Sequence, residues 1–199
     1  MVMELVLASA SPVRTALLSQ AGITHRVQAA RVDEASAKQA LIAEGASARD
    51  IADMLAELKA RKVAEKLPSA FVLGCDQALS LGPRLFSKPT DPADAISQLR
   101  DLQGQTHHLH AAVVLYEAAM PVWRHVAEAR MTMRALSDAF ISAYVQRNWP
   151  AISYSVGGYL IEAEGIALFS AVDGEHTAIL GLPLPPLIGY LSNRGLIAT

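Results

Sequence analysis

The sequence predicts a single α/β domain in which helices flank a mixed β-sheet. First, apolar runs suited to buried strands alternate along the chain with segments that carry helical spacing. Second, 52% of the residues are hydrophobic and 18% are charged, which is typical of a globular chain with a real core. Third, the sequence has no repeat, low-complexity tract or long linker, so residues 1–199 are expected to form one domain.

The expected strands are apolar runs bounded by turn residues. They cover residues 3–8, 24–29, 71–81, 84–86, 108–116, 122–133, 159–162 and 166–172. The run at 71–81 is strongly apolar and reads as a buried central strand. Gly82 and Pro83 then turn the chain into the short strand at 84–86.

The expected helices have clear starting residues. Ser11 is a good N-cap, and Pro12 suits the first helical position. Ser47 and Asp50 form a capping box before an apolar stripe. The helices are expected over residues 12–20, 47–66, 91–103, 137–148 and 181–195.

The turn after the first strand has the composition of an anion-binding site. Ser9 and Ser11 supply two hydroxyl groups, and Arg14 supplies a guanidinium in the first helical turn. The N–H groups of that turn have no partner within the helix, and they attract anions. The same residues would also suit an ordinary strand–turn–helix connection with a good cap.

Two acidic segments are candidates for chemistry. Asp76 follows a buried strand, where a carboxylate needs a partner and where ligands gather in α/β sheets. It could hold a divalent metal or act as a general base toward water, or it could simply form a cap or a salt bridge. Asp33 and Glu34 form a second acidic pair, suited to Mg²⁺ or Mn²⁺ or to a solvated turn.

Two lysines are candidates for phosphate binding. Lys59 lies on or beside the apolar row of the helix at 47–66, where a lysine is unexpected. It either reaches inward to a phosphate or extends its ammonium group to solvent. Lys88 precedes Pro89, which restricts the Lys88 backbone to an extended form.

Composition argues against several classes of function. The net charge of −2 argues against binding to nucleic acid polymers, which need a basic face. The single cysteine, Cys75, rules out an internal disulfide and is expected to pack in the core. No apolar run is long enough to span a membrane and no secretory signal is evident, so a soluble cytoplasmic protein is expected.

Taken together, these segments resemble the Maf family of nucleoside triphosphate pyrophosphatases over nearly the whole chain. The matching motifs, in order, are Leu7-Ala8-Ser9-Ala10-Ser11-Pro12 with Arg14, Val32-Asp33-Glu34, Leu55-Ala56 with Lys59-Ala60, Gly74-Cys75-Asp76-Gln77, Lys88-Pro89, Gly104 with His107, Gly158-Tyr159 with Glu162, and Gly181-Leu182-Pro183-Leu184. The resemblance implies a Maf/ITPase-like α/β fold with an elongated mixed sheet and two lobes around a central cleft.

The resemblance also implies a reaction and its residues. Members of the family cleave a nucleoside triphosphate between the α- and β-phosphates, and a divalent cation such as Mg²⁺ or Mn²⁺ assists. By motif position, Asp76 matches the general base, and Glu34 matches an acidic residue that helps to hold the metal together with Asp76. The matches to the phosphate-contacting set are Ser9, Ser11, Arg14, Lys59 and Lys88. A nucleotide substrate and a homodimer are therefore expected.

Three positions depart from the common family pattern and are associated with nucleotide choice. Val13 replaces the first of two arginines, Gln77 stands where many members have threonine, and Glu162 stands where one branch has glutamine. Gln77 and Glu162 look like the branch that acts on 7-methyl-GTP, although that branch tends to carry an aromatic residue in place of Val13. Physically, a carboxylate at Glu162 suits a guanine-like donor edge and a cationic methylated base.

A second class of function stays open. Family members are also associated with septum formation and the arrest of cell division. The loss of the first arginine at Val13 favours a nucleotide-binding regulator with little catalytic activity. Survival of the proposed base and of both lysines favours the enzyme.

Overall fold

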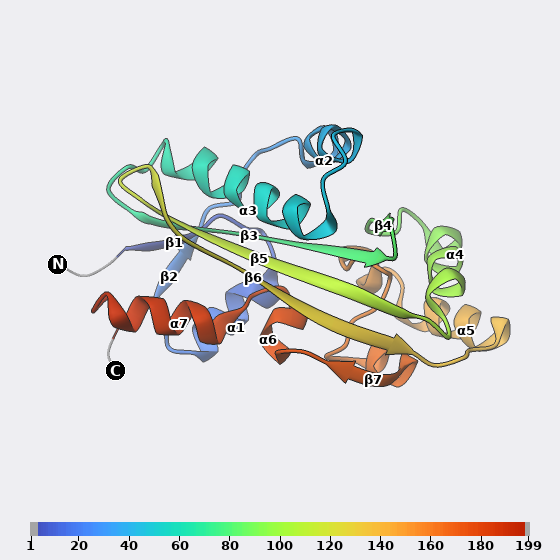
Figure 1. Cartoon of the computed structure of the whole chain (residues 1–199). Helices are drawn as coiled ribbons and strands as arrows, with labels where there is room; N and C mark the ends of the chain where they lie inside the picture. Colours follow the sequence, from blue (N-terminus) through green and yellow to red (C-terminus); the bar gives the residue numbers. More distant parts are fainter. Residues whose placement is uncertain (1–3, 198–199) are drawn as a thin grey trace. The chain divides into compact units, whose positions relative to one another are not determined.

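The computed structural model describes residues 4–197 and confirms a mixed α/β fold (Figure 1). Its strands are β1 (Leu5–Leu7), β2 (His25–Val27), β3 (Phe71–Leu81), β4 (Arg84–Phe86), β5 (Thr106–Glu117), β6 (Met120–Met133) and β7 (Phe169–Asp173). Its helices are α1 (Pro12–Gln20), α2 (Glu34–Ala43), α3 (Ala48–Ala64), α4 (Pro92–Leu102), α5 (Asp138–Asn148), α6 (His176–Ile179) and α7 (Leu184–Asn193). Two short 3₁₀ helices cover Ala151–Tyr154 and Glu164–Leu168. No helix within residues 4–197 is long and apolar enough to cross a membrane.

The strands form one seven-stranded sheet in the order β2-β1-β3-β5-β6-β7, with β4 paired to β3. β1 pairs in parallel with both β2 and β3, so Leu7 lies beside Leu73. The Ala8 amide continues this ladder by donating to the Leu73 carbonyl over 2.8 Å. The carboxyl ends of β1 and of the first half of β3 therefore lie side by side, where parallel strands gather ligand-binding groups.

The chain forms two compact units. Of the described residues, the first unit contains 4–77, 110–127 and 175–197, and the second contains 78–109 and 128–174. The three long strands, β3, β5 and β6, contribute residues to both units. The expected single domain and the expected cleft between two lobes stay predictions.

In the first unit, the alternation of side chains along β3 separates two faces of the sheet. Cys75 belongs to a buried apolar cluster with leucines of β1, α1 and α7. The Asp76 side chain points the other way, as a Cβ built at Gly74 would, toward α3, which covers the opposite face (Figure 1). Consecutive residues of β3 therefore lie in two different environments, the apolar cluster on one face and the α3 side on the other.

The structure differs from the expected elements in several places. Residues 34–43 form α2, a helix that was not predicted because Leu41 is the only buried residue among its weakly patterned side chains. The predicted strand at 159–162 is wrong, since the chain there runs through turns after Gly157 and Gly158, both with positive φ. Strand β7 begins only at Phe169, after a 3₁₀ turn. Met3, the first residue of the first predicted strand, lies outside the described residues.

A buried histidine anchors the second unit. His107 is fully buried on β5, and its Nε2 atom lies 2.8 Å from the Tyr159 hydroxyl oxygen. Phe169 packs against both rings. Burial, with a smaller contribution from His108, lowers the pKa of His107 to about 4. The folded protein therefore holds this imidazole in its neutral form.

We expect His107 to make folding pH-dependent. The unfolded chain takes up a proton on this ring near its ordinary pKa of 6.5, whereas the folded chain resists until about pH 4. Stability is therefore full above pH 6.5 and falls as the pH drops toward 4, by about 3 kcal/mol in total. Urea unfolding at pH 7.5 and 4.5 measures the loss, and His107→Gln should lose about 2 kcal/mol less than the parent. Equal losses in both proteins would contradict the assignment.

Candidate active site

The centre of the candidate site is a buried lysine held between two carboxylates. The Nζ atom of Lys59 lies 2.6 Å from Oδ1 of Asp76 and 2.8 Å from Oε2 of Glu34. Lys59 and Asp76 are both buried, whereas the Glu34 side chain is about half exposed. One interpretation of the sequence was that Lys59 extends its ammonium group to solvent. The structure contradicts it, because the ammonium group is buried between the two carboxylates. Lys59 joins the two acidic segments singled out in the sequence.

A close approach of α3 to β3 makes this contact possible. Gly74 has no side chain, and a Cβ built there would lie 2.1 Å from the Ala56 carbonyl oxygen and 2.7 Å from the Ala60 nitrogen. Only glycine on the strand, opposite alanines on the helix, lets the two backbones come this near. Lys59 and Asp76, which flank these small residues, are thereby brought within hydrogen-bonding distance.

The acidic pair at 33–34 divides into two roles. Asp33 is the N-cap of α2 and accepts a hydrogen bond from the Ser36 amide over 3.0 Å. This backbone bond, together with one from the Ser36 hydroxyl, lowers the pKa of Asp33. Glu34 begins the helix and reaches Lys59. Capping by Asp33 thus orients the helix that presents Glu34.

Arg14 organises the turn after β1. Its Nη1 atom donates to the Cys75 carbonyl over 2.9 Å and to the Ser9 hydroxyl over 3.1 Å, and its Nε donates to the Gly181 carbonyl over 2.8 Å. Ser11 caps α1 by accepting from the Arg14 amide. The Nη2 group makes no hydrogen bond within residues 4–197, so it can donate to a ligand. The first turn of α1 and this guanidinium lie together, and anion binding by them stays a prediction.

The three specificity candidates lie in different surroundings. Val13 is half-buried against the apolar cluster beneath α1. Gln77 donates its side-chain amide to the Ala178 and Ile179 carbonyls over 3.2 and 2.9 Å. Glu162 is exposed in the second unit, as is the phosphate-binding candidate Lys88. The contacts above therefore form two groups within the first unit, and neither group includes Lys88 or Glu162. One group contains Ser9, Ser11 and Arg14, and the other contains Glu34, Lys59 and Asp76.

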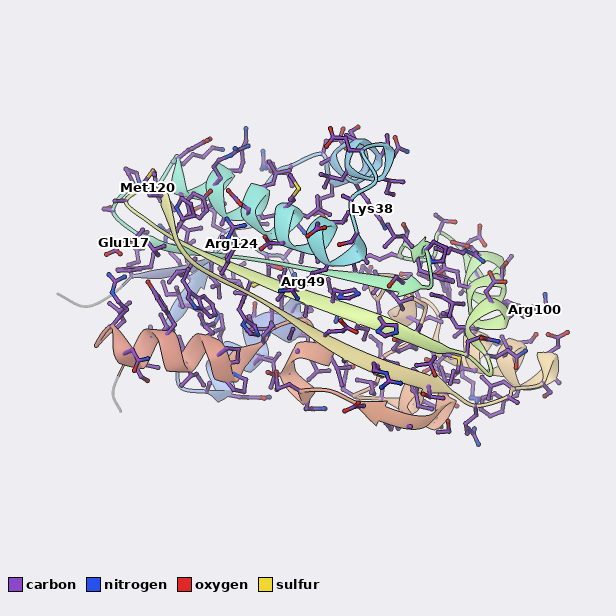
Figure 2. All side chains as sticks on the ribbon, in the orientation of Figure 1. Lys38, Arg49, Arg100, Glu117, Met120 and Arg124 are labelled. Atoms are coloured by element: carbon purple, nitrogen blue, oxygen red, sulfur yellow. The ribbon has the colours of Figure 1, made fainter. Side chains whose placement is uncertain are left out.

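One lysine near this cluster was missed from the sequence. Lys38, labelled in Figure 2, lies one helical turn after Glu34 on α2 and is half-buried. Burial lowers the pKa of its ammonium group, and the charge of Asp76 opposes that shift. The spacing of four residues between Glu34 and Lys38 places both on one helix face. This spacing could have predicted that Lys38 lies near Glu34, but only if residues 34–43 had been predicted as a helix.

The donor set fits a divalent cation that arrives with a phosphate ligand. Asp76 and Glu34 already hold one cationic nitrogen between their oxygens. Within the described part of the chain, no group of three or more His, Cys, Asp or Glu residues could hold a metal ion. Mg²⁺ typically binds one or two carboxylates and completes its shell with water and substrate phosphates. The two carboxylates of Asp76 and Glu34 match that number.

Cys75 has the packing role expected from the sequence. Its side chain is fully buried in the apolar cluster, and burial raises the pKa of the thiol to about 11. The thiol is therefore protonated at neutral pH and is not a nucleophile. The Cys75 backbone carbonyl contributes to the site, through Arg14.

The fold and these contacts define an α/β protein in which a strand–turn–helix connection with Arg14 accompanies a lysine–carboxylate cluster. The chain belongs to the family of Maf-like proteins, whose family model matches residues 4–194. The nucleoside triphosphate pyrophosphatase of Ruegeria pomeroyi is 51% identical over 199 residues, covering 100% of both chains. The 7-methyl-GTP pyrophosphatase of Rhizobium meliloti is 47% identical over 193 residues, covering 97% of both chains.

Proposed function

We propose that this protein is a metal-dependent nucleoside triphosphate pyrophosphatase that releases a nucleoside monophosphate and pyrophosphate. The observation that carries the proposal is the contact of Lys59 with both Asp76 and Glu34. Arg14 and the first turn of α1 supply further groups for the phosphates in the same unit. The names of the full-length relatives support the same activity.

In the proposed reaction, Asp76 is the general base. Its carboxylate accepts a proton from a water molecule as the water oxygen attacks the α-phosphorus. The bond between the α-phosphorus and the bridging oxygen breaks, and its electron pair leaves with pyrophosphate. A substrate phosphate gives Lys59 a third anionic partner beside Glu34 and Asp76, which releases the Asp76 carboxylate to accept the proton.

The cationic groups stabilise the charge that builds up on the leaving pyrophosphate. Arg14 is pre-oriented by three hydrogen bonds, so it needs little reorganisation to bind a phosphate oxygen. Glu34 and Asp76 would hold a divalent cation, which neutralises phosphate charge when it is bound. We propose Ser9, Ser11 and Lys88 as further phosphate contacts on the strength of their motif positions.

Release of pyrophosphate from a panel of nucleotides tests this function. The panel holds canonical, deoxy- and 7-methylated nucleoside triphosphates with Mg²⁺ or Mn²⁺, and the products are separated to show which phosphate bond breaks. We expect a monophosphate and pyrophosphate, with no release after chelation by EDTA. Nucleotide binding without product across the panel would instead favour the regulatory protein. The preferred nucleotide would also show whether the resemblance of Gln77 and Glu162 to the 7-methyl-GTP branch is informative.

Replacing Lys59 with methionine should separate catalysis from metal binding. The variant loses a cation that stabilises phosphate charge, so kcat/KM should fall by about a hundredfold or more. The two carboxylates also lose their shared ammonium group, so Mn²⁺ should bind more tightly in the absence of nucleotide. Mn²⁺ titration followed by electron paramagnetic resonance measures that affinity.

Lys62→Met is the matched control, because Lys62 is exposed on the same helix. It should leave both Mn²⁺ affinity and kcat/KM near the parent values. If Lys59→Met binds Mn²⁺ no more tightly than Lys62→Met does, Asp76 and Glu34 are not the metal ligands.

A further inference from the structure

Gln77 faces away from the carboxylate that it follows. Adjacent residues of a strand point to opposite faces, and Asp76 points to Lys59 on the α3 side. Gln77 shares the other face with Cys75, which is packed among side chains of α1 and α7. The Gln77 side chain is therefore directed away from the lysine–carboxylate cluster.

The partners of Gln77 belong to a short C-terminal segment, residues 175–184. Its Nε2 atom donates to the Ala178 carbonyl at 3.2 Å and to the Ile179 carbonyl at 2.9 Å. One amide nitrogen is thus within hydrogen-bonding distance of two backbone oxygens near the end of α6. The Nε2 group of Gln77 is therefore engaged with the protein backbone, and Oε1 is its remaining polar atom.

The segment 175–184 is internally well ordered. Glu175 caps α6 by accepting from the Thr177 and Ala178 amides. The Leu182 amide donates to the Thr177 carbonyl, and the Leu184 amide donates to the Thr177 hydroxyl. Hydrogen bonds that fix α6 in place therefore also fix the turn at Gly181. The φ of +94° at Gly181 suits glycine.

That turn reaches Arg14. The Gly181 carbonyl accepts from Nε of Arg14 over 2.8 Å, and a Cβ at Gly181 would lie only 3.2 Å from Nη2. Arg14 is bonded on its other side to the Cys75 carbonyl, two residues before Gln77. Strand β3 thus contacts Arg14 twice: directly through Cys75, and indirectly through Gln77, α6 and Gly181.

We propose that Gln77 is a positioning residue, which anchors residues 178–181 so that the Gly181 carbonyl orients the Arg14 guanidinium with Nη2 directed to a substrate phosphate. This proposal rests on the proposed pyrophosphatase function. It replaces the expectation that Gln77 reads the nucleotide base. Phosphates are common to all the nucleotides, so the effect of Gln77 should be the same for each of them.

Gln77→Leu tests this role, because leucine fills a similar volume and cannot donate. We expect kcat/KM to fall by about tenfold to a hundredfold for every substrate, as misplacement of a positioning group does. The ratio of kcat/KM between 7-methyl-GTP and GTP should stay within about threefold of the parent ratio, since both lose the same contact. A changed ratio with the better substrate unaffected would show that Gln77 reads the base.

Gln103→Leu is the matched control. Gln103 is another half-buried glutamine with a bond to the backbone, since its Oε1 accepts from the Leu136 amide. Its bond lies in the second unit, distant in sequence from Arg14, so kcat/KM should be unchanged. A similar loss of kcat/KM in both variants would indicate that Gln77→Leu acts through general destabilisation, and this would overturn the proposal.

A double-mutant cycle with Arg14→Lys shows whether the effect passes through Arg14. Lysine keeps the charge but cannot make the three bonds of the guanidinium. In the Arg14→Lys background, Gln77→Leu should lower kcat/KM by no more than about threefold. Losses that multiply would overturn the proposed connection.

Hydrogen exchange gives a readout that does not depend on turnover. In Gln77→Leu, the Leu182 and Leu184 amides should exchange faster, because the segment opens more easily. Unchanged exchange would contradict the anchoring role even in an active enzyme. If the parent protein hydrolyses no nucleotide, the proposed function fails, and exchange alone then decides whether Gln77 anchors the segment.

Discussion

Replacing Asp76 with asparagine is expected to lower kcat for pyrophosphate release by about a hundredfold to ten-thousandfold. Asparagine has nearly the same shape but cannot accept the proton from the attacking water. Lys59 keeps Glu34 as an anionic partner, so the variant should still fold. Steady-state release of pyrophosphate from the best substrate measures the loss, and circular dichroism verifies the fold.

Asp33→Asn provides a control with the same chemical change. Asp33 caps α2 without contacting Lys59, and asparagine is an equally good N-cap. This variant should therefore keep kcat close to that of the parent. An Asp76→Asn protein that folds and turns over within about threefold of Asp33→Asn would show that Asp76 is not the general base.

Replacing Gly74 with alanine should destabilise the protein by at least about 3 kcal/mol. The new Cβ would lie 2.1 Å from the Ala56 carbonyl oxygen, and the atoms it meets include backbone of α3 that no side-chain rotation can move away. The helix would have to shift, and the contact between Lys59 and Asp76 would be lost with it. We therefore expect activity to fall even where enough protein remains folded to assay.

Gly189→Ala is the matched control for this loss of stability. Gly189 lies within α7, and a Cβ built there meets nothing within 4 Å. The change should be neutral or should stabilise the protein by up to about 1 kcal/mol, because alanine favours the helix. Urea unfolding measures both variants. A Gly74→Ala protein within about 1 kcal/mol of its parent would contradict the close packing described here.

Much of the fold could be predicted from local patterns. Serine caps at Ser11, Ser47 and Ser137 marked the starts of three helices, and each serine accepts the expected amide bond. Helix α2 was missed because its pattern is weak and tertiary packing supports it. The strand expected at 159–162 was wrong because its apolar residues pack in a turn-rich segment.

The candidate site divides in the same way. The order of residues alone determined that an acidic residue stands in a buried apolar run and that a serine-containing turn opens the helix that carries Arg14, because both depend on neighbours in the chain. Only the tertiary structure decided that Lys59 joins Asp76 to Glu34 and that Gln77 binds α6. The partners in these pairs lie 17 to 102 residues apart in sequence and on different secondary structure elements. No local sequence pattern therefore predicts the contacts between them. The physical reason has two parts. The close approach of α3 to Gly74 sets the distance between Lys59 and Asp76, and the alternation of side chains along β3 sets the directions in which Asp76 and Gln77 point.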